Sequence, residues 1–406
     1  MWTSPGGGRG KREPKINLNN QGAIVMQTDT LPEWTEARAI AALEENRQVM
    51  IPGLREQAEG QKVYVEHEFA QLKGVILGNP ESMYLPDPFH PSWYTSFRSL
   101  PREKLDWMAA NRGKHVRDVD RGLWESMAKG LEALADAYRQ SGAHVIQNTQ
   151  APPPEVINYT SGWLGQFGKH WAFHAQAFGE TFGNVLVNFH ETQPSIRYNC
   201  VEYIEAFMGL VENDPDMVWL TMPNPLPMPT AFGVGLSPGD IRIFPNKLVV
   251  VGHGVFDRAH ITDLSKPRSS GNELGAEVLR RMLKPFDWRV EQIYFDANYG
   301  YHIDTLMPVI REGLIAVNEN VLLTDLPAEI RDWEQINIDP DEYVIGAGNS
   351  VALSSDAQAI TAGAKKYIKA VEKRGVNVVP VPFDDVYHST GSGMHCATFS
   401  YWREDD

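Results

Sequence analysis

The residues best suited to chemistry lie in the polar stretch 384–396, which brings a cysteine next to a histidine. Cys396 is one of only two cysteines in 406 residues. The thiolate is the reactive form of cysteine, and a neighbouring imidazolium or backbone N–H groups lower the pKa of the thiol. Gly391 and Gly393 let the backbone curl so that N–H groups can face an anion. The pattern indicates a nucleophilic cysteine on a loop, although a lone cysteine is more often a buried structural residue.

Three further residues could serve such a nucleophile, which needs a base and a group that orients the base. His302 and Asp304 follow an expected strand and would point to the same face of an extended chain. Asp240 stands at the start of another expected strand, after a Pro-Gly turn. Each pattern alone is commonly structural, since Gly-Asp before a strand is ordinary turn chemistry. Together with Cys396 they predict an active site where loops meet a sheet.

A competing pattern is the histidine pair His170 and His174, which would lie on one helix face and could bind zinc. Glu180, His190 and Glu191 follow this pair in the sequence. No glutamate follows the first histidine as in the zinc-protease motif, and packing among aromatic residues explains the pair more simply. The sequence also has no phosphate loop and no dinucleotide fingerprint. We therefore expect neither a metal nor a cofactor.

Composition narrows the class of protein. A hydrophobic content of 42% and a charged content of 22% allow one large domain or two to three average ones. The net charge of −15 argues against nucleic acid and an anionic membrane as partners. No apolar run is long enough to cross a membrane, and residues 1–12 lack the apolar centre of a secretory signal. With two distant cysteines, a cytoplasmic location is the default expectation.

Periodicity predicts an α/β fold. Apolar residues at helical spacing predict helices over 32–47, 118–140 and 272–283, and Asp356 is a plausible N-cap for a fourth helix that ends at 374. Hairpins alternate with single helices, which favours a radial arrangement of ββαβ units over a doubly wound sheet. Strands are expected at 63–69, 72–78, 144–147, 184–189, 241–244, 248–252, 290–295, 313–317 and 376–381.

Two of these motifs resemble the glycine amidinotransferase family of the guanidine-modifying pentein superfamily. Tyr301–Asp304 is similar to the family's Met-His-Ile-Asp, and Gly393–Cys396 is similar to its Gly-Phe-His-Cys. Both are specific motifs. Weaker similarities follow in family order over residues 65–402, at 69–78, 142–145, 183–185, 197–203 and 239–240.

The resemblance implies a five-bladed α/β propeller of ββαβ modules with the site at its centre. Residues 63–406 would form this single catalytic domain, and residues 1–62 an N-terminal extension that is partly flexible. Cys396 would attack the guanidinium carbon of a donor, usually arginine. His302 would be the general acid and base, Asp240 would orient His302, and Asp304 would pair with guanidinium N–H groups.

The chemistry of a guanidinium agrees with these implied roles. Its delocalised charge makes the carbon a poor electrophile, so the reaction needs a thiolate and carboxylates that hold the N–H groups. An imidazole can give the leaving amine its proton. A second amine would then attack the amidino-cysteine in a ping-pong reaction without a cofactor. We expect small-molecule substrates, and a homodimer is one possible assembly.

Two alternatives stay open. A guanidine hydrolase of the same scaffold, of the arginine deiminase or dihydrolase type, would need the same cysteine, histidine and carboxylates. A catalytically silent binding protein is the third hypothesis, and the joint presence of Asp240, His302 and Cys396 speaks against it.

The sequence departs from the family around the acceptor. Tyr299 and Tyr301 precede the histidine where the family has Asn-Pro-Met, and their rings could wall the pocket. Residues 318–322 contain no arginine, where glycine-type members carry one for a substrate carboxylate. We therefore expect an acceptor amine larger than glycine. Three further substrate-binding candidates are Glu180 and Asn184, nearest to the family's acidic residue on the first guanidinium-binding loop, and Arg197, a substitute carboxylate clamp.

Overall fold

The computed structural model describes residues 35–46, 51, 53–89, 97, 100–152, 173–190, 200–223 and 233–405. The chain divides between Gln48 and Val49 into two units. In the first unit the structure describes helix α1, Glu36–Asn46, which confirms the helix expected over 32–47 for those residues. All residues discussed below belong to the second unit. The predicted division at residue 62 stays a prediction.

In the described part of the second unit the strands form five small sheets, and each repeats one pattern of pairing. Two strands form an antiparallel pair, and a third strand lies parallel to one of them. The sheets are β1-β16-β2-β3 (Tyr64–Val65, Thr398–Arg403, Leu72–Leu77, His144–Gln147), β4-β5-β6 (Gly179–Phe182, Val185–Asn188, Val218–Thr221), β7-β8-β9 (Ile241–Phe244, Leu248–Val255, Arg289–Asp296), β10-β11-β12 (Val309–Arg311, Leu314–Ala316, Glu334–Ile336) and β13-β14-β15 (Val351–Ser354, Ala357–Thr361, Asn377–Val381).

Helices connect the parallel strands, as a crossover requires. Helix α6, Arg121–Gln140, joins β2 to β3, and α8, Cys200–Asn213, joins β5 to β6. Helix α9, Glu273–Leu283, joins β8 to β9, and α11, Lys365–Glu372, joins β14 to β15. In the described segment 317–333, the connection from β11 to β12 contains no helix. The expected ββαβ order is thus observed in four of the five units. Shorter helices are α2 (Leu54–Gln57), α4 (Arg102–Ala110), α5 (Val116–Val119), α10 (Pro340–Tyr343) and α12 (Asp384–Thr390).

Local sequence explains where α6 begins and which face it buries. The side chain of Asp120 accepts a hydrogen bond from the backbone N–H of Leu123, which caps the helix. Leu123, Met127, Leu131, Leu134 and Tyr138 then lie at helical spacing and are buried. The predicted helix over 118–140 is confirmed from Arg121 onward.

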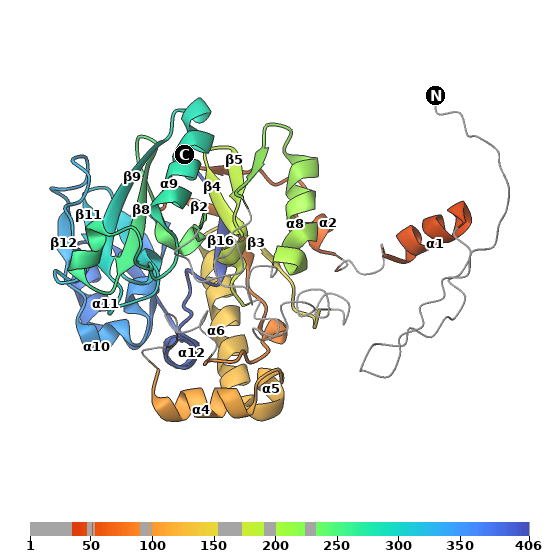
Figure 1. Ribbon diagram of the computed structural model, residues 1–406, viewed down its shortest axis with the longest axis horizontal. Coiled ribbons are helices and arrows are strands. Elements are labelled where there is room, and N and C mark those ends of the chain that lie inside the picture. Colours follow the sequence, from red (N-terminus) through yellow and green to blue (C-terminus); the bar gives the residue numbers. More distant parts are fainter. Residues whose placement is uncertain are drawn as a thin grey trace, which may run out of the picture. The chain divides into compact units, whose positions relative to one another are not determined.

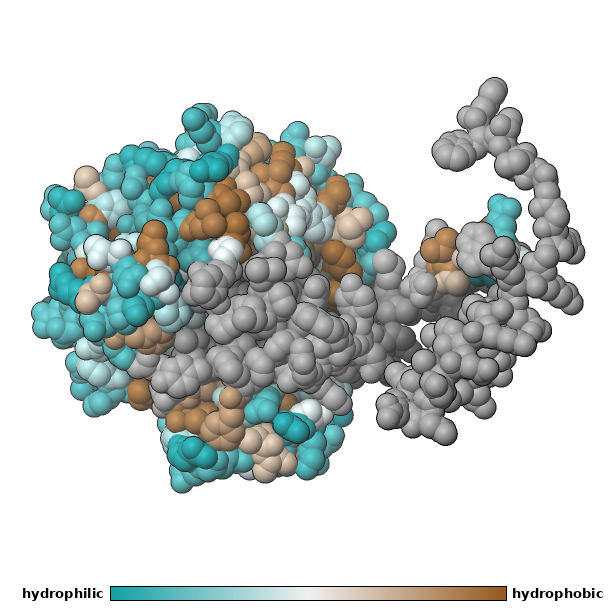
Figure 2. Space-filling model, in the orientation of Figure 1, coloured by the Kyte–Doolittle hydropathy of each residue, from teal (hydrophilic) through white to brown (hydrophobic). Residues whose placement is uncertain are grey.

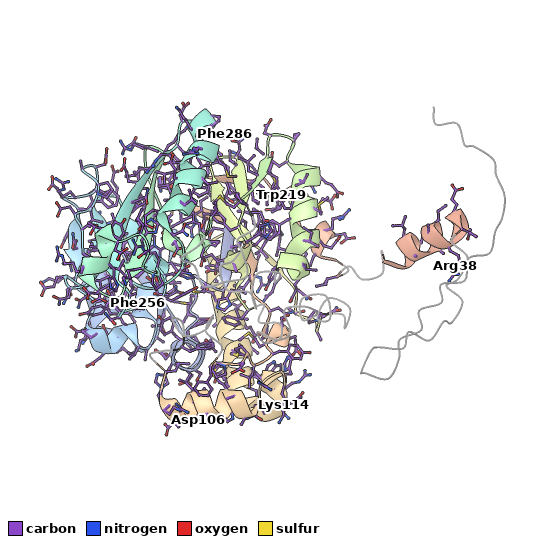
Figure 3. All side chains as sticks on the ribbon, viewed as in Figure 1. Arg38, Asp106, Lys114, Trp219, Phe256 and Phe286 are labelled. Carbon is purple, nitrogen blue, oxygen red and sulfur yellow. The ribbon has the colours of Figure 1, made fainter. Side chains whose placement is uncertain are left out.

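Side-chain packing joins the helices to the sheets. Trp219 on β6 lies against Phe207 of α8, with ring centroids 6.1 Å apart (Figure 3). All eight residues of β8 are buried, which explains why the strand begins with the continuous apolar run 248–251 rather than an alternation. On the face drawn in Figure 2, hydrophilic residues cover much of the described surface and the apolar areas between them are small. None of the described helices combines the length and the apolar character that crossing a membrane would need.

Two of the expected elements were wrong. The helix predicted from 356 to 374 is strand β14 followed by α11. Ala357 and Ala359 favour a helix locally, but β14 pairs with β13 on one side and β15 on the other, and these ladders override the propensity. The stretch 384–396 was expected to be a loop, yet α12 occupies its first part and ends at Gly391, whose φ of 69° lies in the left-handed region.

Segments far apart in the sequence meet in the first sheet. Strand β16 lies between β1 and β2, so residues near 400 pair with residues near 65 and 75 (Figure 1). Side chains from strands of all five sheets line one cavity: Val65, Glu180, Ile243, Val309, Val351, Ala352, Phe399 and Arg403 among them. The observed architecture is therefore a mixed α/β fold of five sheets that share one central cavity.

Candidate active site

Asn349 fixes the position of the candidate nucleophile. Its side-chain Oδ1 accepts hydrogen bonds from the backbone N–H groups of His395 and Cys396, at 2.9 and 3.2 Å. Its Nδ2 lies 3.4 Å from Cys396 Sγ. Gly393 packs so closely on Asn349 that a Cβ at that position would overlap the amide. The fully buried Asn349 therefore holds the cysteine loop, and glycine is required beside it.

Asp304 lies directly beside the thiol. Its Oδ2 is 3.6 Å from Cys396 Sγ, 3.2 Å from Asn349 Nδ2 and 3.3 Å from His395 Nδ1. Its Oδ1 is buried and has no hydrogen-bond partner among the described residues, and it lies 3.9 Å from His302 Nδ1. A fully buried carboxylate oxygen without a partner is rare and marks a position that a ligand could satisfy.

Electrostatics set the resting states of these two groups. Burial raises the pKa of Asp304, but the N–H of His395 and the positive charges that His395, His302 and Arg242 can carry outweigh it and hold that pKa at about 2. Burial and the charge of Asp304 raise the pKa of Cys396 well above its ordinary value. The carboxylate is therefore ionised and the cysteine rests as a thiol, contrary to the expectation that its surroundings lower the thiol pKa.

A serine links the candidate base to Asp240. Asp240 Oδ2 accepts hydrogen bonds from Ser270 Oγ at 3.1 Å and from the backbone N–H of Gly271 at 2.9 Å. His302 Nε2 lies 2.9 Å from the same Ser270 Oγ. Because a carboxylate can only accept, the Ser270 hydroxyl donates its hydrogen bond to Asp240. The same hydroxyl oxygen accepts a hydrogen bond from the Nε2–H of His302. Nδ1 of His302 is turned toward Asp304, 3.9 Å from its Oδ1.

The predicted contact between Asp240 and His302 is indirect and runs through Ser270. The sequence analysis did not identify Ser270. The backbone of Gly239 also packs against the ring of His302, where a Cβ would overlap Nδ1. Serine is too common a residue type to signal such a role, and Ser270 is 32 residues from His302 in the sequence.

Arg242 is a second functional residue that the sequence analysis missed. It is fully buried on β7, where its Nη1 donates to Glu68 Oε2 at 3.0 Å and lies 2.9 Å from His395 Nε2. Its Nη2 donates to the backbone carbonyl of Asp304 at 2.7 Å. A signal was available, since an arginine inside the apolar run Ile241–Phe244 must find partners for a buried charge.

Of the two tyrosines expected to wall the pocket, only Tyr301 is seen in contact with the histidine among the described residues. The rings of Tyr301 and His302 are 4.1 Å apart between centroids, and the Tyr301 carbonyl accepts a hydrogen bond from Ser269 Oγ at 2.7 Å. Tyr299 is half-buried and packs against the apolar cluster that includes Leu306.

The other substrate-binding candidates are placed differently from one another. Glu180, on β4, lines the central cavity together with His395. Burial and the charge of Glu68 raise the pKa of Glu180 to about 8. Asn184 does not reach this cavity, because it sits in the turn between β4 and β5 and its Nδ2 donates to the Asp216 carbonyl at 2.5 Å. Arg197 lies outside the described residues.

The structure gives little support to the alternative hypothesis of a zinc site. His170 lies outside the described residues, and His174 Nε2 pairs with the hydroxyl of Ser392. Elsewhere in the described chain, only Glu66, His67 and Asp405 bring three ligand atoms within 4.8 Å of one another. The Nδ1 of His67 is buried without a partner, whereas a metal-bound histidine normally donates its second N–H. These residues therefore fit a metal poorly.

Comparison with known proteins places the fold. No family model matches the sequence, and no curated protein matches it. Among solved structures, it is similar to SxtG, an amidinotransferase from Microseira wollei in the saxitoxin biosynthetic pathway, with a TM-score of 0.65, 17% identity and coverage of 85% of this chain and 98% of that one. The inosamine-phosphate amidinotransferase of Streptomyces griseus gives a TM-score of 0.60 with 17% identity, over 85% and 97% of the two chains.

Hydrolases share the same fold. The N-terminal domain of ArgZ, an arginine dihydrolase from the cyanobacterial ornithine–ammonia cycle, matches with a TM-score of 0.53 and 13% identity, over 82% of this chain and 98% of that one. The structure is thus of the pentein type and resembles the amidinotransferases, as the two sequence motifs indicated. Identities this low establish the fold and leave the reaction to be argued from the site.

Proposed function

We propose that this protein is an amidinotransferase that moves an amidino group from a guanidine donor, L-arginine in the first instance, to an amine. The proposal includes a five-bladed α/β propeller, with the five sheets as blades around the central cavity. The observation that carries it is the unpaired Oδ1 of Asp304, a buried oxygen 3.9 Å from His302 Nδ1, on a carboxylate whose other oxygen lies 3.6 Å from the thiol of Cys396. A planar cation with forked N–H donors satisfies that oxygen.

The bound cation would also activate the nucleophile. The charge of Asp304 raises the pKa of Cys396 in the empty site. A guanidinium beside Asp304 offsets that charge, so the thiolate becomes accessible only when the donor is bound. The thiol proton passes to the Nδ1 lone pair of His302.

Two half-reactions then follow. Sγ of Cys396 bonds to the guanidinium carbon, the C–N bond to the donor amine breaks, and His302 gives its proton to the leaving nitrogen. The acceptor amine next gives a proton to His302 as its nitrogen attacks the amidino carbon, and the C–Sγ bond breaks. Asp240, acting through Ser270, stabilises the imidazolium that forms between these steps.

A hydrolase is the second candidate, because ArgZ shares the fold and water could take the amidino group instead of an amine. Two observations favour transfer over hydrolysis. The two amidinotransferases have higher TM-scores than ArgZ. Tyr301 packs beside His302 and supplies apolar contact area that water does not need.

The test is to incubate the protein with arginine alone and measure its intact mass and the released products. A stable adduct of one amidino group on Cys396, with a single equivalent of ornithine, supports the transferase. Sustained formation of urea and ornithine, or of citrulline and ammonia, means a hydrolase. Absence of any adduct or product contradicts both and favours a silent binding protein.

The proposed acceptor is an amine larger than glycine. Segment 318–322 carries no arginine, and its Val321 is fully buried, so a carboxylate clamp is missing there. Glu180 and Arg197 remain candidates for contacts with the acceptor. The acceptor is identified by competition among glycine, lysine, ornithine, an aminoalcohol and a diamine. The guanidinylated products are then measured by mass spectrometry. Glycine as the best acceptor would refute this assignment.

A further inference from the structure

His395 precedes the nucleophile and lies between two charged groups. Its Nδ1 is 3.3 Å from Oδ2 of Asp304, at ion-pair distance but without the alignment of a hydrogen bond, and its Nε2 is 2.9 Å from Nη1 of Arg242. A histidine next to a reactive cysteine suggests a base or an activating imidazolium. The two neighbours determine whether the ring can play either part.

The contact with Arg242 fixes the tautomer of the ring. A guanidinium has only donors and stays charged, so Nε2 of His395 must be the acceptor in this contact. A neutral imidazole has one N–H, which therefore sits on Nδ1 and faces the Asp304 carboxylate. Protonation of Nε2 would set two N–H groups and two positive charges against each other at 2.9 Å.

Arg242 is itself held in place. Besides His395 it binds the Glu68 carboxylate at 3.0 Å and the Asp304 carbonyl at 2.7 Å, and its side chain is fully buried. Glu68 is anchored in turn by the backbone N–H of Ile243 at 2.9 Å. The guanidinium therefore has no alternative position from which to release the ring.

We propose that His395 is a positioning residue, locked by Arg242 as the neutral Nδ1–H tautomer, which holds Oδ2 of Asp304 so that Oδ1 stays turned toward His302 and the incoming guanidinium. The inference rests on the proposed function for its catalytic consequence. It assigns the acid–base role to His302 alone and removes the histidine adjacent to Cys396 from proton transfer.

The tautomer can be tested without any substrate. The full-length protein is labelled with ¹⁵N-histidine, and the His395 resonances are assigned by their loss in H395N. The expected spectrum has Nε2 at the shift of an unprotonated nitrogen and Nδ1 at that of a protonated one. A protonated Nε2 would overturn the proposal, whatever the protein's activity.

The positioning role is tested by two variants that each keep half of the contacts. In H395N the amide nitrogen replaces Nδ1 and can still donate to Asp304, whereas in H395Q the amide oxygen replaces Nε2 and meets only Arg242. A lost polar contact with a buried carboxylate costs roughly 10- to 100-fold in kcat/KM, so H395Q should fall that far below H395N. Thermal unfolding of both variants controls for folding.

Equal losses in H395N and H395Q would contradict the positioning role, since a base or a purely steric residue would not favour the asparagine. If the wild-type protein processes no guanidine at all, the proposed function fails, and the ¹⁵N spectrum alone still decides the tautomer.

Discussion

The replacement of Asp304 by asparagine should make the candidate cysteine more reactive and the enzyme inactive. The substitution keeps the shape of the side chain and removes one buried charge that lies 3.6 Å from Cys396 Sγ. That charge is one of the two main causes that raise the pKa of the thiol. It is also the proposed acceptor for the guanidinium, so the variant should lose donor binding.

The size of the effect follows from the distance. Two unit charges about 4 Å apart interact with about 4 kcal/mol at an effective dielectric constant of about 20. Removal of the charge should therefore lower the pKa of the Cys396 thiol. Because each step of about 1.4 kcal/mol is a factor of ten, the thiolate fraction at neutral pH should rise by up to several hundredfold.

Alkylation by iodoacetamide, followed at the Cys396 peptide by mass spectrometry across neutral pH, measures this fraction. Asp304→Asn should alkylate faster than the wild type while arginine turnover disappears. The exposed Asp325 provides a matched control, and Asp325→Asn should change neither rate. Alkylation of Asp304→Asn at or below the wild-type rate would refute the proposed electrostatic control of the thiol.

The remaining predictions concern the nucleophile, its base and the central cavity. Cys396→Ala should abolish both the amidino adduct and turnover, whereas Cys200→Ala at the start of α8 should keep them; the reverse result would exclude Cys396 as nucleophile. Asp240→Asn and Ser270→Ala should lower kcat by similar factors, since the carboxylate acts through the serine, and a silent Ser270→Ala would contradict the bridge. The pKa of Glu180, raised to about 8 from 4.5, means that the folded protein retains a proton that the unfolded chain releases above pH 4.5. The free energy of unfolding should therefore fall as pH rises between these values, and Glu180→Gln should show a shallower fall when urea unfolding is measured at both ends of the range.

The sequence was most informative where local patterns agree with burial. Helix α6 was predicted because its apolar residues recur at helical spacing within one segment. Strand β8 was predicted from an unbroken apolar run. Strand β14 was predicted wrongly because its alanines favour a helix, and only pairing with β13 and β15 makes it a strand. Such pairings join residues that no local window contains.

The residues of the candidate site likewise fall into those that a local motif indicates and those that only the tertiary fold brings together. Cys396, His302 and Asp304 were expected from short motifs, and the structure places Asp304 3.6 Å from the thiol of Cys396 and 3.9 Å from Nδ1 of His302. Asn349 and Ser270, which hold them, are common polar residues 47 and 30 positions from partners that they bind, Cys396 and Asp240. Their roles depend on the tertiary fold, so residue type alone could not indicate them.

The place of β16 between β1 and β2 has a consequence for the newly made chain. Arg403 on β16 donates a hydrogen bond to the Ala70 carbonyl, 333 residues away. Strand β2 can therefore pair with β16 only after residues near 400 have been synthesised. Pairings of such separation form late. Because Cys396 directly precedes β16, a nascent chain that ends before this strand carries Asp304 and His302 without their thiol and cannot react prematurely. In that interval the open edge of β2 is the place where the chain would aggregate or recruit a chaperone.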